Sequence, residues 1–282
     1  MITVLRTIEE VRAWRAARPG ERVAFVPTMG ALHEGHISLI HRARALAPRA
    51  LASVFVNPTQ FNDPKDFERY PIDVEGDLAA LERAGCEACF LPSVEVMYPA
   101  GGQTRVRVGA LADHLCGAAR PGHFEGVCTV VSSLFHITQC EVAVFGEKDF
   151  QQLAIIRQMA RDLHFPVEVV GAPTAREGDG LAMSSRNRRL RPEHRAQAAG
   201  VYAGLSAARA AWGEGVRAVG ALKGAALARF PLEGRVDYLE VCDALTLSPL
   251  VEGGERGAGA VVMAAAVFLG EVRLIDNVVL EG

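Results

Sequence analysis

The stretch that decides the fold is residues 22–46, RVAFVPTMGALHEGHISLIHRARAL. Residues 22–26 form a short apolar run that ends at Pro27, which predicts a buried strand. Apolar residues at 37, 39, 40, 43 and 46 follow at nearly helical spacing and predict a helix over 37–46. Gly30 and Gly35 lie in the turn between them, where glycine lets the backbone approach a ligand closely. The stretch therefore predicts a strand, a ligand-binding turn and a helix.

The same alternation continues along the first part of the chain. Further strands are predicted at 51–56, 88–91, 141–145 and 167–170, and helices at 74–84, 134–138 and 150–163. Gly85 suits the C-terminal cap of the helix over 74–84. Strands that alternate with helices predict an α/β fold with a mostly parallel, doubly wound sheet, whose ligands bind at the carboxyl ends of the strands.

The pattern changes after about residue 176. Helical regions are predicted at 193–211 and near 216–229, followed by strands at 236–242, 259–269 and 272–279. This is an α+β pattern rather than a continued alternation. We therefore expect a Rossmann-like domain over residues 1–176 and a smaller α+β domain over residues 177–282.

Composition and charge limit the classes of protein. Half of the 282 residues are hydrophobic, which provides a packed core, and the net charge of −3 provides no global field for nucleic acid or an anionic membrane. The N-terminus lacks a signal-peptide pattern, and the longest apolar stretch, residues 258–269, is shorter than the roughly 20 residues of a membrane helix. We expect a soluble, cytoplasmic protein with reduced thiols.

Six scattered cysteines include one CxxC pair, Cys86 and Cys89. Tetrahedral zinc needs four ligands and no second pair follows, so these are interpreted as structural thiols, with a zinc or redox site as the alternative.

His33 and His36 are the first candidate catalytic residues. They lie three positions apart at the expected start of a helix and so share one face of its first turn. A helix start offers unpaired N–H groups and the positive end of the dipole, which together favour an anion. Imidazoles beside such donors suit a phosphate whose charge grows in a transition state. A zinc motif of the HExxH type is disfavoured because its histidines lie four apart, and a plain N-cap with a polar helix face is the structural alternative.

Three further segments follow the turn His33-Glu34-Gly35-His36, the HxGH motif, in order. They are Phe55-Val-Asn57-Pro-Thr-Gln60-Phe61, Phe145-Gly-Glu-Lys148-Asp-Phe-Gln-Gln152-Leu, and Asp179-Gly-Leu-Ala-Met183-Ser-Ser-Arg186-Asn187. With the first motif they closely resemble the pantothenate synthetase (pantoate–β-alanine ligase) family over residues about 23–190. This resemblance implies a nucleotidylyltransferase-like fold, of the type shared with class I aminoacyl-tRNA synthetases, and a C-terminal domain that acts as a lid.

The resemblance also implies an activity. The family condenses (R)-pantoate with β-alanine through a pantoyl-adenylate and releases AMP and pyrophosphate. ATP is then a substrate that arrives with Mg²⁺, because Mg²⁺ commonly binds through nucleotide phosphates. No protein ligand of the metal is predicted. Neither a nucleic acid nor a membrane is an expected partner, and the family implies a homodimer.

The family's site residues can be carried over position by position. His36, which matches the proton donor of the family, His33 and Lys148 are the predicted catalytic residues, and Gln60 and Gln152 the predicted ligands of pantoate or β-alanine. The predicted ATP site consists of Met29, Gly30, Ala31, Leu32, His33, Glu34, Gly35, His36, Gly146, Glu147, Lys148, Asp149, Ala175, Met183, Ser184, Ser185 and Arg186.

Lys148 is one of three lysines beside 27 arginines. Outside the motif, an exposed structural lysine would be the ordinary interpretation. Met183 to Arg186 resembles the KMSKS loop of synthetases, where hydroxyls and an arginine suit phosphate.

Other basic residues have weaker contexts. Arg188, Arg189, Arg191 and Arg195 are interpreted as a solvated helix start with inter-domain ion pairs rather than a nucleic-acid surface. Arg120 is a candidate for holding phosphate. His114, His123, His136, His164 and His194 are expected to be packing or surface residues.

Two rival functions remain open from the sequence. A related adenylyltransferase would share the HxGH turn but not the context of Gln60 and Gln152. A nucleotide- or RNA-binding module without catalysis would have a basic face and dispensable histidines.

Overall fold

The computed structural model describes residues 1–251 and 260–281. These residues group into two compact units. The first unit comprises Met1–Val108, Arg120–Glu147 and Gln152–Pro173, and the second comprises Gly109–Ala119, Lys148–Gln151 and Thr174–Gly282. None of the helices in the described part of the chain is both long and apolar enough to cross a membrane.

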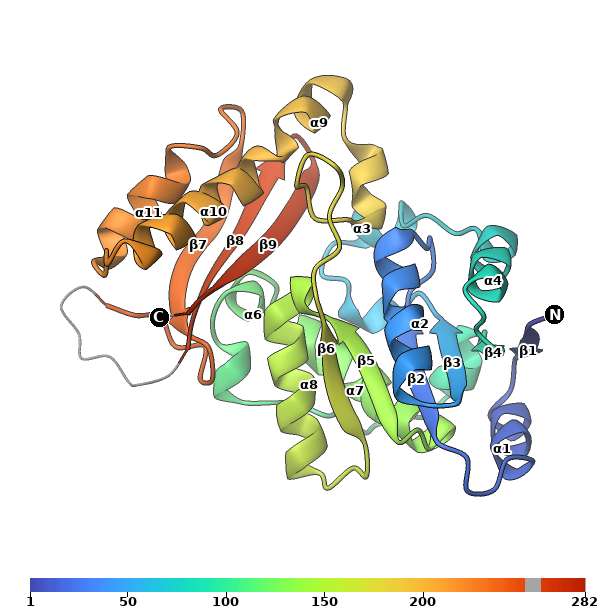
Figure 1. The fold of residues 1–282 in the computed structure, drawn as a ribbon. Helices are drawn as coiled ribbons and strands as arrows, with labels where there is room; N and C mark the ends of the chain where they lie inside the picture. The colour runs from blue at the N-terminus through green and yellow to red at the C-terminus, as the bar shows by residue number, and fades with distance from the viewer. Residues whose placement is uncertain (252–259, 282) are drawn as a thin grey trace. The chain divides into compact units, whose positions relative to one another are not determined.

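A six-stranded parallel sheet forms the centre of the first unit (Figure 1). In spatial order its strands are β1 (Thr3–Leu5), β4 (Ala88–Phe90), β3 (Arg49–Val54), β2 (Val23–Thr28), β5 (Val142–Gly146) and β6 (Glu168–Ala172). The chain runs from β2 through β3 to β4 in one direction and from β5 to β6 in the other. The predicted parallel, doubly wound sheet is confirmed, and its winding reverses between β2 and β5. In such sheets, ligands bind beyond the carboxyl ends of the strands at this reversal.

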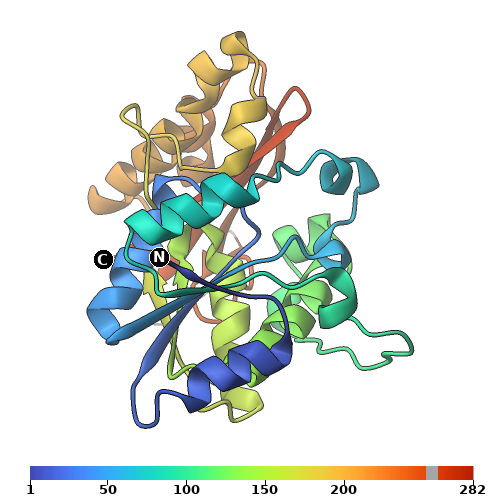
Figure 2. The same cartoon turned by 90° about the vertical axis from the view of Figure 1, so that its right-hand side faces the viewer.

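Helices cover both faces of this sheet. Helix α2 (Glu34–Leu46) packs on β2, β3 and β5 and also contacts α4 (Val74–Arg83). Helix α7 (His123–Thr138) packs on β2 and on α1 (Ile8–Ala16). Figure 2, which looks onto the β1 edge, shows α2 and α7 on opposite sides of the sheet. Ala24 and Val26 face the α2 layer with Ile40, so the strand register directs alternate side chains into two cores.

Helix α8 (Phe150–Asp162), with 13 residues, follows the turn at the carboxyl end of β5. The shorter elements of the first unit are η1 (Pro58–Gln60), α3 (Pro64–Glu68) and α5 (Val94–Met97). The second unit contains η2 (Ala110–Ala112) and α6 (Cys116–Ala119), and η3 (Glu147–Asp149) spans the boundary between the two units.

The second unit contains a three-stranded antiparallel sheet in the order β7 (Arg235–Asp243), β8 (Val261–Leu269) and β9 (Val272–Leu280). In the part of this unit that begins at Thr174, the helical elements are η4 (Ser185–Arg189), α9 (Pro192–Ala198), α10 (Gly200–Gly213) and α11 (Val219–Leu227). Helices α10 and α11 lie against the sheet (Figure 1), where Leu205, Trp212 and Leu222 share a core with Met263 and Val278. The predicted α+β character of this part of the chain is confirmed.

Several predicted boundaries differ from the structure. The helix predicted at 134–138 is only the last part of α7, which begins at His123. The helical region 193–211 consists of two helices that meet at Ala199. Residues 258 and 259, at the start of the predicted apolar stretch and strand, lie outside the described residues.

Candidate active site

His33 and His36 pack against each other at the N-terminus of α2. Their ring centroids lie 4.1 Å apart. The Nδ1 atom of His33 accepts from the Gly35 N–H at 3.1 Å, and Nδ1 of His36 accepts from the His33 N–H at 3.4 Å. A neutral ring that accepts at Nδ1 carries its proton on Nε2. Two Nε2–H donors and the dipole of a 13-residue helix thus meet at one helix start, which suits an anion.

The turn before this helix is held by Asp77, which is not among the site residues predicted from the sequence. Asp77 lies on α4 with 4% of its surface exposed, and its carboxylate accepts from the N–H groups of Ala31 and Leu32 at 2.9 and 2.7 Å. Gly30 has φ +80°, and a Cβ there would lie 2.7 Å from a carboxylate oxygen of Asp77. Gly30 therefore lets the backbone approach the Asp77 carboxylate, whereas the sequence predicted a close approach to a ligand.

A signal for Asp77 was present in the sequence. The residue sits in helical register with Val74 and Leu81, where an apolar residue would be expected. A lone carboxylate at a core-facing position must find hydrogen-bond donors, and here the donors are the main chain of the HxGH turn.

Gln60 lies beside Met29, so the second and first motifs meet in the structure. The Gln60 Nε2 group contacts the Met29 sulfur at 3.1 Å, and Oε1 accepts from Asn57 Nδ2 at 3.0 Å. Asn57 is 1% exposed, and its own Oδ1 accepts from the Tyr98 hydroxyl at 2.7 Å. Burial raises the pKa of Tyr98, which keeps this hydroxyl a donor at neutral pH. These contacts fix the orientation of the Gln60 amide.

The main chain at Gln60 is held from α7 and the loop before it. The Gln60 carbonyl accepts from Arg120 Nη2 at 3.1 Å and pairs with His123 Nδ1 at 2.8 Å. His123 is a buried residue, as expected of a packing residue, and it also anchors a predicted substrate ligand. Neither contact was predicted from the sequence, which indicated a phosphate contact for Arg120 and a packing or surface position for His123.

Gly146 is the last residue of β5, which pairs with β2 in the sheet, and Glu147 to Asp149 form η3 directly after it. In the first unit, Gly146 pairs with Ala172 of β6, and the Glu147 side chain packs close to Gly171. Gln152 is half-buried in the first turn of α8. The turns after β2 and β5 thus start at neighbouring carboxyl ends, at the reversal of the winding.

In the second unit, Met183 to Arg186 forms a capped turn. Ser184 caps η4, since its Oγ accepts from the Arg186 N–H at 3.3 Å. The Met183 N–H donates to the Ala175 carbonyl at 3.0 Å, which brings two predicted ATP-site residues together. Ser185 is buried, and Arg186 is half-buried.

The arginine cluster forms ion pairs inside the second unit. Arg195 pairs with Glu177 at 2.7 Å and Asp179 at 2.5 Å, and Arg191 pairs with Glu193 at 3.2 Å. Arg191 and Arg195 thus form ion pairs, but not the inter-domain ion pairs that were expected of them.

The CxxC pair lies in the core. Cys86 and Cys89 are buried free thiols, and burial raises the pKa of each to about 12, so both are protonated at neutral pH. Within residues 1–251 and 260–281, no three His, Cys, Asp or Glu side chains cluster as a metal site would require.

Comparison with known proteins identifies the family of the chain over nearly its whole length. A family model described as pantoate-beta-alanine ligase matches residues 3–279. The pantothenate synthetases of Pseudomonas entomophila and Herpetosiphon aurantiacus are 49% and 50% identical to the chain. The first alignment covers 99% of this chain and 98% of the relative, and the second covers 98% and 99%.

Solved structures agree with these relatives. The crystal structure of pantothenate synthetase from Thermus thermophilus is 48% identical, with a TM-score of 0.90 over 98% of this chain and 99% of that chain. The Francisella tularensis pantoate-beta-alanine ligase, complexed with beta-gamma ATP and beta-alanine, is 31% identical. Its TM-score is 0.82 over 100% of this chain and 99% of that chain.

Proposed function

The chain belongs to the pantoate–β-alanine ligase family, and on that premise we propose how its residues carry out the family reaction. The enzyme condenses (R)-pantoate with β-alanine and converts ATP to AMP and pyrophosphate. The observation that carries this assignment is the full-length family match, together with the paired histidines at the N-terminus of α2.

The reaction has two steps. A carboxylate oxygen of pantoate attacks the α-phosphorus of ATP, a phosphorus–oxygen bond breaks, and pyrophosphate leaves. The amine of β-alanine then attacks the acyl carbon of the pantoyl-adenylate, AMP leaves, and the nitrogen loses a proton. Adenylation provides a good leaving group, and holding the adenylate beside the amine lowers the entropic part of the barrier.

His33 and His36 are proposed to act in the first step. Their Nε2–H groups and the helix N-terminus stabilise the charge that develops on the phosphates. Donation of a proton by His36 is the additional role that the family implies.

Gln60 is proposed to bind pantoate. Asn57 uses one acceptor site of Gln60 Oε1, and Met29 takes one N–H of the amide. An amide has two acceptor sites and two N–H groups, so one of each remains for a hydroxyl and a carboxylate of the substrate. Gln152 is proposed as the second ligand of pantoate, and Gln60 also faces β-alanine once the adenylate has formed.

Lys148, Ser184, Ser185 and Arg186 are proposed to bind the ATP phosphates. An ammonium, two hydroxyls and a guanidinium are suited to phosphate oxygens. Residues 177–282 are proposed to form a lid over the domain of residues 1–176, which binds ATP and pantoate. A closed lid would protect the adenylate from water.

Magnesium is proposed to enter as part of the ATP substrate, held through phosphate oxygens, and no protein ligand is assigned to it. A homodimer is proposed from the family, and light scattering of the purified protein tests it. A cytoplasmic location is proposed because all six cysteines are free thiols, as a reducing compartment would keep them.

The deciding experiment measures product formation with single substrates omitted. Pantoate labelled with ¹⁸O in its carboxylate should pass one ¹⁸O to AMP, and only when β-alanine completes the reaction. ATP and pantoate alone should give one equivalent of pyrophosphate per site. AMP release from ATP when both pantoate and β-alanine are absent would rule out the ligase. AMP that carries no ¹⁸O in the complete reaction with labelled pantoate would rule out the adenylate. Transfer of AMP to a nucleotide-like acceptor would instead identify the rival adenylyltransferase.

A further inference from the structure

Two polar residues interrupt strand β9 of the second unit. Asp276 and Asn277 are 4% and 9% exposed, whereas Leu274 and Val278 on the same strand are apolar core residues. A buried carboxylate or amide costs free energy unless its polar atoms are hydrogen-bonded. The hydrogen-bond partners of Asp276 and Asn277 therefore explain why these two polar residues occur in an otherwise apolar part of β9.

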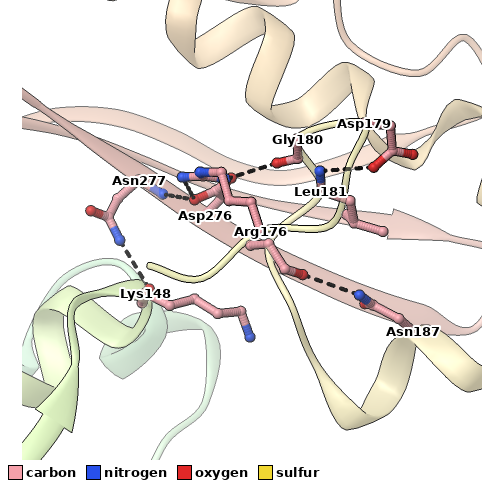
Figure 3. A network of polar contacts seen from close by, with 9 residues as sticks. Lys148, Arg176, Asp179, Gly180, Leu181, Asn187, Asp276 and Asn277 are labelled. Atoms are coloured by element: carbon pink, nitrogen blue, oxygen red, sulfur yellow. Dashed lines mark hydrogen bonds and ion pairs between the residues drawn. The ribbon is translucent and has the colours of Figure 1, made fainter. Parts of the chain in front are cut away.

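Asn277 holds the main chain of Lys148. Its Nδ2 group donates to the Lys148 carbonyl at 2.9 Å, across 129 positions of sequence (Figure 3). The Lys148 side chain extends away from Asn277 in this view, so the bond fixes the base of the side chain and leaves its ammonium to another contact.

Asp276 holds the segment that leads into Ser184. Its carboxylate makes a bidentate ion pair with Arg176, with N–O distances of 2.6 and 3.0 Å. Arg176 also donates to the Gly180 carbonyl at 3.1 Å, so it bridges the two arms of a tight turn (Figure 3). That turn closes with the Met183 N–H bonded to the Ala175 carbonyl, immediately before Ser184.

The two contacts are linked to each other. The Asn277 N–H donates to Asp276 Oδ1 at 2.8 Å, and the same oxygen accepts from Arg176. Arg176 is further confined by Tyr202, whose ring centroid lies 3.5 Å from the guanidinium carbon. One short piece of β9 thus ties down two loops that are far apart in sequence.

We propose that Asp276 and Asn277 are positioning residues, which hold the Lys148 segment and the Ser184–Arg186 loop in the arrangement that binds the ATP phosphates. This inference rests on the proposed function, because it takes both segments to be phosphate-binding. Preorganised donors contribute more than mobile ones, since the protein does not have to order them when the substrate binds.

The experiment compares Asn277→Asp, Lys148→Ala and the double variant in pantoate-dependent pyrophosphate release. Asp preserves the volume of Asn but cannot donate to the Lys148 carbonyl. We expect Asn277→Asp to raise the KM for ATP about five- to tenfold, which corresponds to the net value of one hydrogen bond. In the Lys148→Ala background the same substitution should have almost no further effect, because the positioned ammonium is already gone.

The matched control is Val278→Ala. It removes core volume from the next position of β9 without touching either loop. It should lower the midpoint of thermal unfolding but leave the KM for ATP unchanged. If Asn277 had a purely structural role, Asn277→Asp would also lower the unfolding midpoint without changing the KM for ATP. Alternatively, its effect on the KM would add fully to that of Lys148→Ala, and either result overturns the inference.

A second arm keeps the test decisive if Asn277→Asp does not fold. Arg176→Lys retains the charge but loses the bidentate geometry and the stacking on Tyr202. It should also raise the KM for ATP by about tenfold or more, the effect of one lost charge-assisted hydrogen bond. A KM at the wild-type value overturns the inference. Failure of the proposed function is a distinct result: the wild-type protein would then release no pyrophosphate in response to pantoate.

Discussion

At the scale of single residues, the side chains of His33 and His36 make different hydrogen bonds. His33 is the N-cap of α2, whereas the His36 ring accepts from the His33 N–H at 3.4 Å, a long contact that contributes little to stability. We expect His36→Ala to lower the rate of adenylate formation by about 10²- to 10⁴-fold, the range typical of a lost acid–base or electrostatic donor. Rapid-quench measurement of pyrophosphate release checks this.

His33→Ala serves as the comparison. It removes the side-chain cap and should cost about 1 kcal/mol of folding free energy in addition to activity. His36 also belongs to this capping box, but its bond to the His33 N–H is the longer of the two. His36→Ala should therefore lower the urea midpoint less than His33→Ala does, and an equal loss of stability in both variants would contradict the separate roles.

The residues that the sequence predicted for the site are those with local motifs. His33, His36 and Gln60 could be predicted because a helix start and a short turn after a strand place them. Asp77, Asp276 and Asn277 could not be given partners, since their hydrogen bonds join positions 45 to 129 apart in sequence.

At the scale of elements, Asp77 connects α4 to the turn before α2. Asp77→Asn would turn one acceptor into an NH₂ group facing the N–H of Ala31 or Leu32. An unsatisfied buried group costs about 1–3 kcal/mol, so we expect a loss of this size in the free energy of unfolding and a slower adenylation step. The control is Asp73→Asn, the same change at the exposed N-cap of α4, where Asn caps equally well. Equal urea midpoints for the two variants would show that the turn does not depend on Asp77.

Elements were predictable where the hydrophobic period was clear. Strands β2, β3 and β5 and helices α2, α4 and α8 follow their apolar patterns to within a few residues. Helix α7 was recognised only at its end because nearly all of its positions are buried, so no polar face marks the helical period. Its Val127, Thr129 and Val130 also favour strands. At the break at Ala199 the sequence offers only Gly200, and an isolated glycine within a helical pattern is a weak signal for a helix end. Gly200 also has a packing role, because a Cβ there would lie 2.8 Å from the Arg229 carbonyl oxygen.

At the scale of the whole molecule, the division into units depends on contacts that local patterns do not reveal. Gly109–Ala119 and Lys148–Gln151 group with the second unit, although the chain on both sides of each belongs to the first. Within the second unit, the Cys116 thiol meets the Tyr238 hydroxyl at 3.2 Å, and Lys148 meets Asn277. The chain therefore passes from the first unit to the second between Glu147 and Lys148, inside a single motif.

Buried thiols in both units give the molecule an alkaline limit to its stability. Burial raises the pKa of Cys86, Cys89, Cys128, Cys140 and Cys242 to about 12. In the unfolded chain a thiol has a pKa of about 8.5. Below that pH the thiols are protonated in both the folded and the unfolded chain, and their ionisation takes nothing from the free energy of unfolding. As pH rises towards 12, only the unfolded chain loses these protons, so each thiol removes about 1.4 kcal/mol of stability per pH unit.

Urea unfolding at a series of pH values from about 8 to about 10.5 measures this loss, and Cys140→Ala isolates one thiol. The variant should be less stable at the lower pH because it loses buried volume. Its free energy of unfolding should nevertheless fall less steeply with pH, by about 1.4 kcal/mol per unit once the unfolded thiol is ionised. Tyrosine and lysine ionisation are common to both proteins and cancel in the difference. Parallel curves for the two proteins would show that Cys140 ionises equally in the folded and unfolded states.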